Sequence, residues 1–303
     1  GRIYMGQTGE ICASVYHTGM HKRILITGAS GFTGKHLTAE LASDKTCKLF
    51  LADRNAPKIP HSHFHVCDFS DKDAVTRLIR KIRPDKIFHL VGSYTNEFNT
   101  DYTSNVVTTK NILDAVREAR KPCRILLVGS SAEYGFPISP RKPVAENHPC
   151  RPVSIYGLIK LFQTELMQTY IRLYGLNIVA VRPFNLLGEG VSATLFAGKM
   201  AEEIKRYARG EIREIVTGKL SVQRDYIDID EAIRYYRDVM ERGKEGEIYN
   251  VGSGKDLSCR ALLRRMLKKE GLSFSIVREG KHEVPGKIVV PRIFADISKV
   301  MKL

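Results

Sequence analysis

A glycine-rich turn between an apolar strand and a helix constrains the fold of this 303-residue chain more than any other feature. Segment 22–27 (Lys-Arg-Ile-Leu-Ile-Thr) has the composition of a buried strand, and Gly28-Ala-Ser-Gly31-Phe-Thr-Gly34 follows it directly. Gly28 would allow a tight turn, Gly31 a close backbone approach to a pyrophosphate, and Gly34 close packing of helix on strand. The helix N-terminus would face the phosphates. Together these features predict a dinucleotide-binding βαβ unit.

The next predicted strand, 48–52, ends at Asp53 and Arg54, about twenty residues past the turn, where an acidic residue would bind the adenosine ribose hydroxyls. Asp53 would repel a ribose 2′-phosphate and favours NAD(H). Arg54 would pair with that phosphate and favours NADP(H). The cofactor is therefore NAD(H) or NADP(H), with a slight preference for NAD(H).

Strand-like and helix-like segments alternate along the chain, which predicts an α/β fold: a doubly wound parallel (Rossmann) sheet with a smaller, interleaved C-terminal substrate domain. We expect an N-terminal extension at 1–19, a dinucleotide-binding domain at 20–183 and a second domain at 184–303, from which 225–253 partly returns to the first. Further strands are expected at 64–68, 85–92, 124–129, 177–183, 212–216 and 247–251. Helices are expected at 74–83, 105–120, 156–174, 196–209 and 230–241.

Composition and charge exclude several classes of protein. The net charge of +15 is spread through the chain, without a basic helix with interleaved aromatics or zinc-finger spacing, so nucleic-acid binding is not expected. Such a field would attract anionic nucleotides. No apolar run is long enough to span a membrane. The six cysteines form no Cys-x-x-Cys pair, which favours reduced thiols and a cytoplasmic location. His61, His63 and His65 alternate along a strand, but their number and position do not favour a metal site.

Ligands of open parallel sheets bind beyond the carboxyl ends of the strands, and the candidate residues gather there. Beyond this edge, Tyr156 and Lys160 stand one helical turn apart at the start of a predicted helix, so both side chains leave the same face. A lysine ammonium beside a tyrosine would lower the tyrosine pKa, giving a proton donor and acceptor usable near neutral pH.

A series of motifs continues this pattern. The chain carries, in order, Thr27-Gly-x-x-Gly-Phe-x-Gly34, Asp68, His89-Leu-Val-Gly, Asn105, Ser130-Ser-Ala-Glu-Tyr-Gly135, Tyr156-x-x-x-Lys160, Arg182-Pro-Phe-Asn185, Arg224-Asp-Tyr-Ile-Asp228 and Tyr249-Asn-Val-Gly-Ser-Gly254. This set resembles the extended short-chain dehydrogenase/reductases (the NAD-dependent epimerase/dehydratase family) that act on nucleotide sugars. The sequences of the motifs most resemble those of GDP-4-keto-6-deoxy-D-mannose reductases, with GDP-mannose 4,6-dehydratases next.

The resemblance implies roles for individual residues. Ser130 would hydrogen-bond the reacting sugar oxygen, with Ser131 as an alternative; Tyr156 would be the acid/base, and Lys160 would bind the nicotinamide ribose. The implied cofactor-binding set is Gly28, Ser30, Gly31, Phe32, Thr33, Gly34, Asp53, Arg54, Asp68, Phe69, Leu90, Val91, Gly92, Asn105, Val128, Tyr156, Lys160 and Pro183. The implied substrate-binding set is Ser131, Glu133, Asn185, Lys199 and Arg224. Asp68 would contact the adenine, and capping of a helix from Ser70 onward is a nearly equal alternative.

The implied activity is reduction of a 4-keto-6-deoxy-hexose carried by a GDP-sugar. Dehydratases of this superfamily place a glutamate, sometimes after an aspartate, where this chain has Ala132 and Ser131; Glu133 stands one residue late, and a small loop shift would be needed to use it. A 4-epimerase uses the same three catalytic residues and stays open. A non-catalytic dinucleotide sensor is less expected, because such proteins typically lack the tyrosine–lysine pair.

The resemblance also bears on assembly and on the end of the chain. Helices 105–120 and 156–174 resemble the pair that forms a homodimer interface in relatives, although their apolar faces would equally pack on the sheet. Relatives usually continue past the position of Leu303, so a further C-terminal piece is expected.

Overall fold

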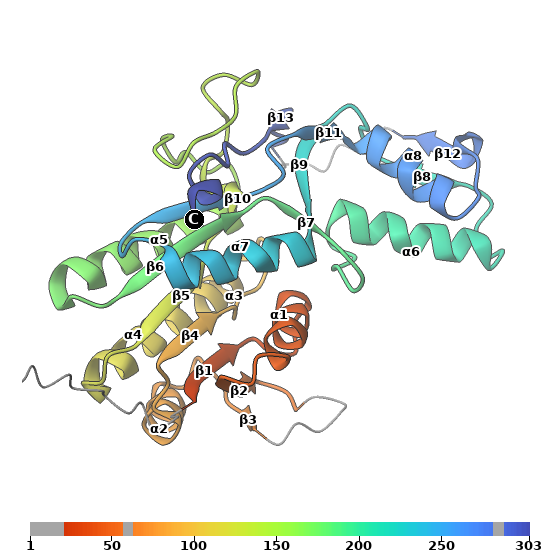
Figure 1. The fold of residues 1–303 in the computed structure, drawn as a ribbon. Helices are drawn as coiled ribbons and strands as arrows, with labels where there is room; N and C mark the ends of the chain where they lie inside the picture. Colours follow the sequence, from red (N-terminus) through yellow and green to blue (C-terminus); the bar gives the residue numbers. More distant parts are fainter. Residues whose placement is uncertain (1–20, 57–62, 281–287) are drawn as a thin grey trace, which may run out of the picture.

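The structure is a computed structural model that describes residues 21–56, 63–280 and 288–303 (Figure 1). The predicted extension 1–19 and His61 lie outside the described residues. The centre is a parallel seven-stranded sheet, in the order β10-β6-β5-β4-β1-β2-β3. Its strands are β1 (Lys22–Thr27), β2 (Cys47–Asp53), β3 (Phe64–Val66), β4 (Lys86–His89), β5 (Arg124–Val128), β6 (Ile178–Pro183) and β10 (Ile248–Val251). The predicted α/β Rossmann architecture is confirmed.

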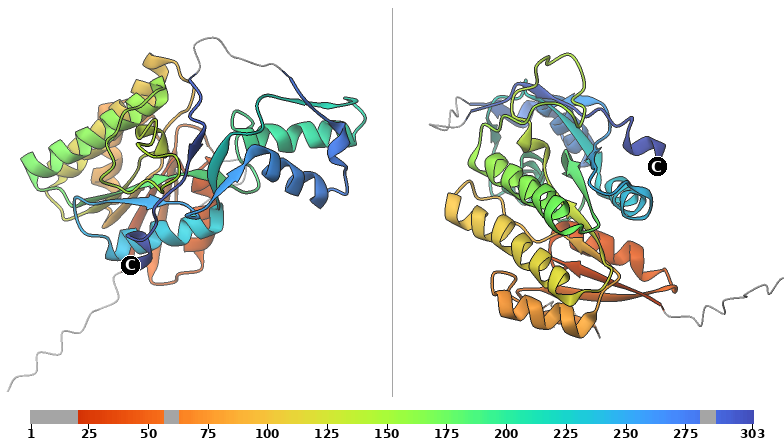
Figure 2. Two further views of the ribbon diagram at one scale, coloured as in Figure 1. Left: turned by 90° about the horizontal axis from the view of Figure 1, so that it is seen from above. Right: turned by 90° about the vertical axis from the view of Figure 1, so that its left-hand side faces the viewer.

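Helices cover both faces of this sheet (Figure 2). Successive strand residues point to opposite faces, so Ile24 and Ile26 of β1 join one apolar core and Leu25 joins the other. The first core includes α1 (Phe32–Ala42) and α7 (Ile229–Arg242); the second includes α2 (Lys72–Ile82), α4 (Thr108–Ala119) and α5 (Ile155–Tyr174). Burial on both faces explains why the strands read as continuous apolar runs.

The helix expected at 105–120 is longer and irregular. It begins as α3 (Phe98–Asp101), passes through the π-helical turn η1 (Tyr102–Val107) and continues as α4. Asn105 lies inside η1 and is 1% exposed. π-helical turns are uncommon and occur frequently at functional sites.

The remaining elements form a smaller unit that projects to one side of the sheet (Figure 1). In a mixed sheet, β9 (Gln223–Asp228) pairs with β7 (Asn185–Leu187), β11 (Asp256–Ser258) and β13 (Arg292–Ile293). A second pair joins β8 (Ile215–Thr217) to β12 (Val277–Glu279), and these strands share an apolar core with α6 (Phe196–Ala208) and α8 (Cys259–Lys269). Short 3₁₀ turns are η2 (Ser131–Glu133), η3 (Phe274–Ile276) and η4 (Val300–Lys302). Within the described ranges, no helix combines the length and apolarity needed to cross a bilayer.

Candidate active site

A cavity of about 920 Å³ opens where the sheet ends and the smaller unit begins. Its walls come from the segments that follow β4, β5 and β6, together with the start of α5. Predicted site residues that line it are Phe32, Thr33, Leu90, Val91, Gly92, Asn105, Val128, Ser130, Ser131, Tyr156, Lys160, Pro183, Asn185 and Arg224. Those that stand outside its lining are Gly28, Ser30, Gly31, Gly34, Asp53, Arg54, Asp68, Phe69, Glu133 and Lys199.

The glycine turn is built so closely that side chains do not fit. Gly28 has a φ of +69°, and a Cβ there would lie 2.9 Å from the backbone carbon of Leu90. A Cβ on Gly34 would lie 2.3 Å from the carbonyl oxygen of Gly28. Helix α1 therefore starts directly against the end of β1, with its N-terminus at the turn, where an anion is stabilised.

Asp53 stands next to this turn, at the end of β2. Its Oδ2 accepts from the backbone N–H of Ser30 at 2.9 Å, and its Oδ1 accepts from the backbone N–H of Arg54 at 2.7 Å. The Ser30 hydroxyl is buried and has no hydrogen-bond partner among the described residues. A carboxylate, an unpaired hydroxyl and a glycine cradle fit the ribose and pyrophosphate of a dinucleotide, with the exposed Arg54 beside them.

Asp68 and Phe69 follow β3. Asp68 is exposed, and its Oδ1 accepts from the backbone N–H of Ser70 at 2.9 Å and from the Ser70 hydroxyl at 2.7 Å, which lowers the pKa of Asp68. The cap of α2 is Asp71, which accepts from two backbone N–H groups, so the alternative of Asp68 as helix cap is wrong. Phe69 is buried at 3% exposure.

The start of α5 brings Tyr156 and Lys160 into the cavity. The Ser154 hydroxyl caps the helix by accepting from the backbone N–H of Gly157 at 3.0 Å. Lys160 is 4% exposed, and burial lowers its pKa to about 8. Its Nζ donates to Val128 O at 2.7 Å, to Gln163 Oε1 at 2.7 Å and to Asn105 Oδ1 at 3.3 Å.

The expected lowering of the Tyr156 pKa by Lys160 is wrong for this structure. Burial raises the pKa of Tyr156, and a hydrogen bond with the Ser130 side chain only partly opposes the rise. The physical reason is that the Lys160 ammonium is directed at three other acceptors rather than at the phenol. The ring of Tyr94 packs edge-on against the Tyr156 ring, with 4.8 Å between centroids.

Ser130 follows β5 and begins the turn η2. Its hydroxyl accepts from the backbone N–H of Ala132 at 3.1 Å, and its own N–H donates to Glu133 Oε1 at 2.8 Å. The two contacts form a capping box that fixes the turn. Ser131 and Ala132 also line the cavity, so both serines stay available to a ligand.

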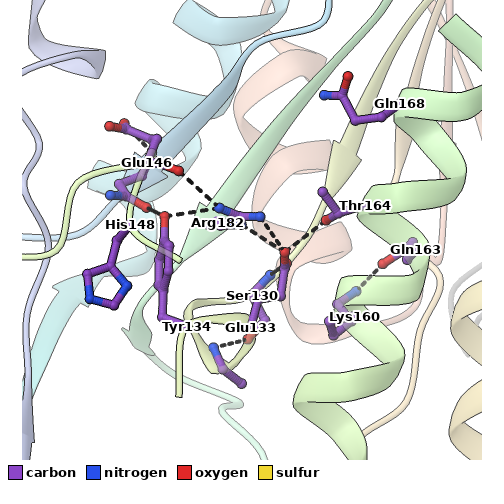
Figure 3. A network of polar contacts seen from close by, with 12 residues as sticks. Ser130, Glu133, Tyr134, Glu146, His148, Lys160, Gln163, Thr164, Gln168 and Arg182 are labelled. Carbon is purple, nitrogen blue, oxygen red and sulfur yellow. Dashed lines mark hydrogen bonds and ion pairs between the residues drawn. The ribbon is translucent and has the colours of Figure 1, made fainter. Parts of the chain in front are cut away.

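Glu133 does not reach the cavity, which corrects its expected role in substrate binding. It is fully buried, and its Oε2 accepts from Arg182 Nε at 2.8 Å and from the Thr164 hydroxyl at 2.9 Å (Figure 3). Figure 3 also shows Arg182 between Glu133 and the Tyr134 hydroxyl, which accepts from Arg182 at 3.3 Å. Burial alone would lower the pKa of Arg182, but the Glu133 carboxylate raises it. An arginine in an apolar strand needs such a partner.

Of the three residues expected to bind phosphate, the structure places two at the cavity and one outside it. Asn185 and Arg224 line the cavity; Asn185 Nδ2 donates to Asp225 O at 2.9 Å, and burial lowers the pKa of Arg224. Lys199 is exposed on α6, outside the lining. Tyr236 lines the cavity unexpectedly; its buried hydroxyl lacks a hydrogen-bond partner within the described part of the chain. Its position inside an otherwise apolar helix face gave no functional signal.

The histidines of the third-strand region do not form a metal centre in the part of the chain that is described. His63 and His65 pack beside the Phe50 ring, with centroids 5.4 Å and 6.3 Å away. Across the described ranges, no group of three histidine, cysteine or carboxylate side chains is close enough to hold a metal ion.

Comparisons with known proteins agree with this geometry. A sequence model of the NAD dependent epimerase/dehydratase family matches residues 24–252. The chain is 27% identical over 266 residues to a GDP-6-deoxy-D-mannose reductase of Pseudomonas aeruginosa, covering 86% of this chain and 84% of the relative. It is 29% identical over 289 residues to a putative UDP-glucose 4-epimerase of Methanocaldococcus jannaschii, covering 92% of each.

Solved structures have the same fold. RMD from Pseudomonas aeruginosa, in complex with NADPH, superposes with a TM-score of 0.79 at 25% identity, covering 93% of this chain and 91% of that one. UDP-glucose 4-epimerase from Thermus thermophilus, in complex with NAD, superposes with a TM-score of 0.81 at 23% identity, covering 92% of each chain. With a family match over most of its length and a glycine turn shaped for a dinucleotide, the chain belongs to the NAD dependent epimerase/dehydratase family and is an enzyme that uses NAD(H) or NADP(H).

Proposed function

We propose that the enzyme reduces the keto group of a 4-keto-6-deoxy-hexose carried by a nucleoside diphosphate, with GDP as the favoured nucleotide. The observation that carries this proposal is that the side chains of Ser130, Tyr156 and Lys160 line the same cavity. Two hydroxyls of this kind supply what a carbonyl reduction needs from the protein: one donates the proton, and the other stabilises the oxygen by a hydrogen bond. The reductase relative from Pseudomonas aeruginosa supports the sugar and the nucleotide.

The bound nicotinamide supplies or accepts the hydride in this chemistry. Tyr156 donates its phenolic proton to the carbonyl oxygen as the adjacent carbon gains the hydride, so the product is an alcohol. Burial raises the pKa of Tyr156, so the phenol is protonated at neutral pH and the proton to be donated is present. The Ser130 hydroxyl donates a hydrogen bond to the same oxygen, and Lys160 holds the nicotinamide ribose.

The wall around Ser130 favours reduction over dehydration. Ala132 and Ser131 line the cavity at the positions where a dehydratase would present its acid and base. The one nearby carboxylate in this turn, Glu133, is held away from the cavity by Arg182, Thr164 and the Ser130 backbone. The loop shift that a dehydratase would need must therefore break a buried ion pair.

The two cavity residues from the smaller unit suit the sugar diphosphate. Arg224 presents a guanidinium, whose paired N–H groups match phosphate oxygens. Asn185 lines the same wall, and Lys199 would contact a phosphate only from the solvent side. These contacts suit any nucleoside diphosphate, so GDP is favoured through the relative and not through them.

A homodimer through α4 and α5 is part of the proposal. Phe98 of α3, Tyr102 of η1, and Phe162 and Leu173 of α5 are exposed by 39–65%, and both α3 and η1 contact α5. Exposed apolar side chains on adjoining helices mark an interaction surface. The test compares the sedimentation of the wild type with that of Phe162→Asp. A wild type that sediments as a monomer, like the variant, would refute the dimer.

The cytoplasm is the proposed location, because the five described cysteines are free thiols.

The decisive experiment is anaerobic mixing of the protein with NADH or NADPH and GDP-4-keto-6-deoxy-mannose, followed at about 340 nm, where the reduced nicotinamide absorbs. We expect loss of absorbance with the wild type and a far slower loss with Tyr156→Phe. Comparison of NADH with NADPH in the wild type gives the cofactor preference. If absorbance is unchanged and GDP-, UDP-, CDP- or dTDP-hexoses give redox-neutral products, the enzyme is a 4-epimerase or dehydratase. The epimerase relative from Methanocaldococcus jannaschii makes the former the second candidate.

A further inference from the structure

Lys160 is surrounded by a complete set of acceptors before any ligand binds. An ammonium has three N–H donors, and they are directed to the Val128 carbonyl, the Gln163 amide oxygen and the Asn105 amide oxygen. The contact with Asn105 is the longest, at 3.3 Å, whereas the other two are 2.7 Å. A ligand hydroxyl that binds Lys160 would therefore displace Asn105, while Val128 and Gln163 would keep their contacts.

The orientation of the Gln163 amide is fixed by Thr109. The Thr109 hydroxyl donates its proton to the backbone carbonyl of Asn105 at 2.6 Å. Its oxygen can therefore only accept from Gln163 and His89, its two other neighbours. Gln163 Nε2 donates to Thr109 Oγ1 at 2.7 Å, which leaves the amide oxygen facing Lys160. Figure 3 shows this contact between Lys160 and Gln163.

The chain of hydrogen bonds continues through the sheet to the glycine turn. His89 Nε2 lies 3.0 Å from Thr109 Oγ1, and His89 Nδ1 lies 2.9 Å from Thr27 Oγ1. Because Thr109 uses its proton on Asn105, His89 donates from Nε2 and accepts from the Thr27 hydroxyl at Nδ1. Burial lowers the pKa of His89 to about 3, which keeps this tautomer neutral.

Every member of the chain is buried. Thr27, Thr109 and Gln163 are fully buried, and His89 is 1% exposed. Water therefore has no access to replace a lost partner, and each contact depends on the next. An amide oxygen held in this way is a fixed acceptor, unlike a side chain at the surface.

We propose that Gln163 is a positioning residue for the reaction: anchored by Thr109 and His89, its amide oxygen keeps the Lys160 ammonium charged and in place at the cavity wall. This inference rests on the proposed function for the role of Lys160 in catalysis. Without Gln163, the ammonium, which is only 4% exposed, would lose one of its three protein acceptors, and its neutral form would become more favoured. The neutral amine would bind and orient the cofactor ribose less well.

Trace labelling of the ligand-free protein with acetic anhydride tests the inference directly. The yield at Lys160, read by mass spectrometry between pH 6 and 10, gives the fraction of neutral amine, and we expect a wild-type midpoint near pH 8. Gln163→Met should lower the midpoint by about one pH unit, as loss of one hydrogen bond to a charged group implies. Gln163→Glu should raise it, because a carboxylate favours the ammonium.

Gln168→Met is the matched control, because Gln168 lies farther along α5 and its Nε2 donates to Gly246 O at 2.8 Å, away from Lys160 (Figure 3). It should leave the midpoint unchanged. Opposite shifts in the two Gln163 variants would not arise from loosening of the fold, which would move both the same way. The inference would be overturned if the Lys160 midpoint did not shift in the Gln163 variants, or if it shifted in the same direction in both. If Gln163→Met does not fold, Thr109→Val takes its place and should also lower the midpoint; an unchanged midpoint there overturns the inference.

A binding titration separates this inference from the proposed function. Gln163→Met should weaken NADH or NADPH binding about tenfold at neutral pH, measured by nicotinamide fluorescence, and Gln168→Met should not. Unchanged affinity in Gln163→Met would overturn the link to the cofactor. Failure of the wild type to reduce the keto-sugar, with the Lys160 shifts present, would instead refute only the proposed reaction.

Discussion

The buried pair of Glu133 and Arg182 allows a quantitative prediction. Arg182→Met removes the cation but leaves a fully buried carboxylate with only the Thr164 hydroxyl and the Ser130 N–H as donors. Loss of one partner of a buried ion pair costs about 3–5 kcal/mol, because the remaining charge is unpaired. At about 2–4 °C per kcal/mol for a domain of this size, the melting temperature should fall by roughly 10 °C.

The assay is equilibrium unfolding in urea, followed by far-UV circular dichroism because the chain contains no Trp. Arg237→Met is the control: its pair with Glu40 has both side chains 43% exposed, so the expected loss is about 0–1 kcal/mol. In a double-mutant cycle, Glu133→Gln with Arg182→Met should lose less free energy of unfolding than the two single changes added together, by about 1–3 kcal/mol. A loss in Arg182→Met no larger than in the control, or an additive cycle, would refute the reasoning.

Four further predictions concern the site and its surroundings. Tyr156→Phe should lower turnover by about 10²–10⁴-fold with the dinucleotide affinity unchanged; a parallel loss in a fluorescence titration would argue against a proton-donor role. Gly34→Ala places a Cβ 2.3 Å from a backbone oxygen of the turn and should weaken dinucleotide binding at least about tenfold, so wild-type affinity would contradict the close packing. Asp53→Ser should shift the ratio of dissociation constants toward NADPH, since the neighbouring arginine then has no competing carboxylate; an unchanged ratio would speak against this placement of the ribose. The pKa of His89 falls from 6.5 to about 3 on folding, so between these pH values the unfolded chain binds a proton that the native chain does not. The free energy of unfolding should therefore fall as the pH decreases from 6.5. His89→Gln should flatten this slope, measured by urea titrations at several pH values.

The Rossmann sheet was predictable because its signals are local. Each strand buried on both faces is a continuous apolar run, and the glycine turn joins the first strand to its helix within a few residues. The return of segment 247–251 to the main sheet was predicted in the same way and is confirmed by β10. Strands β7, β11, β12 and β13 were missed, since each has only two or three residues and no hydrophobic period. Strand β9 was noted only as the motif at 224–228.

The candidate site was predictable as a set of positions, but its internal contacts were not. Glu133 was expected at the substrate because the motif places it beside the candidate serines. Its partner Arg182 lies 49 residues later, and no sequence pattern indicates that the two side chains form an ion pair. The direction of Lys160 depends on Val128 and Asn105, which other elements supply. The roles assigned to the cavity residues stay predictions until they are measured.

The π-helical turn η1 also makes this segment unusually intolerant of changes in length. Each residue of a regular helix is rotated by about 100° from the one before it, so deleting Val106 or Val107 would restore α-helical winding but turn everything before the deletion, Asn105 included, around the axis relative to α4. Asn105 would then leave Lys160, although no side chain near the cavity had been replaced. In this stretch the number of residues is itself part of the active-site design, and variation among functional homologues should be confined to substitutions.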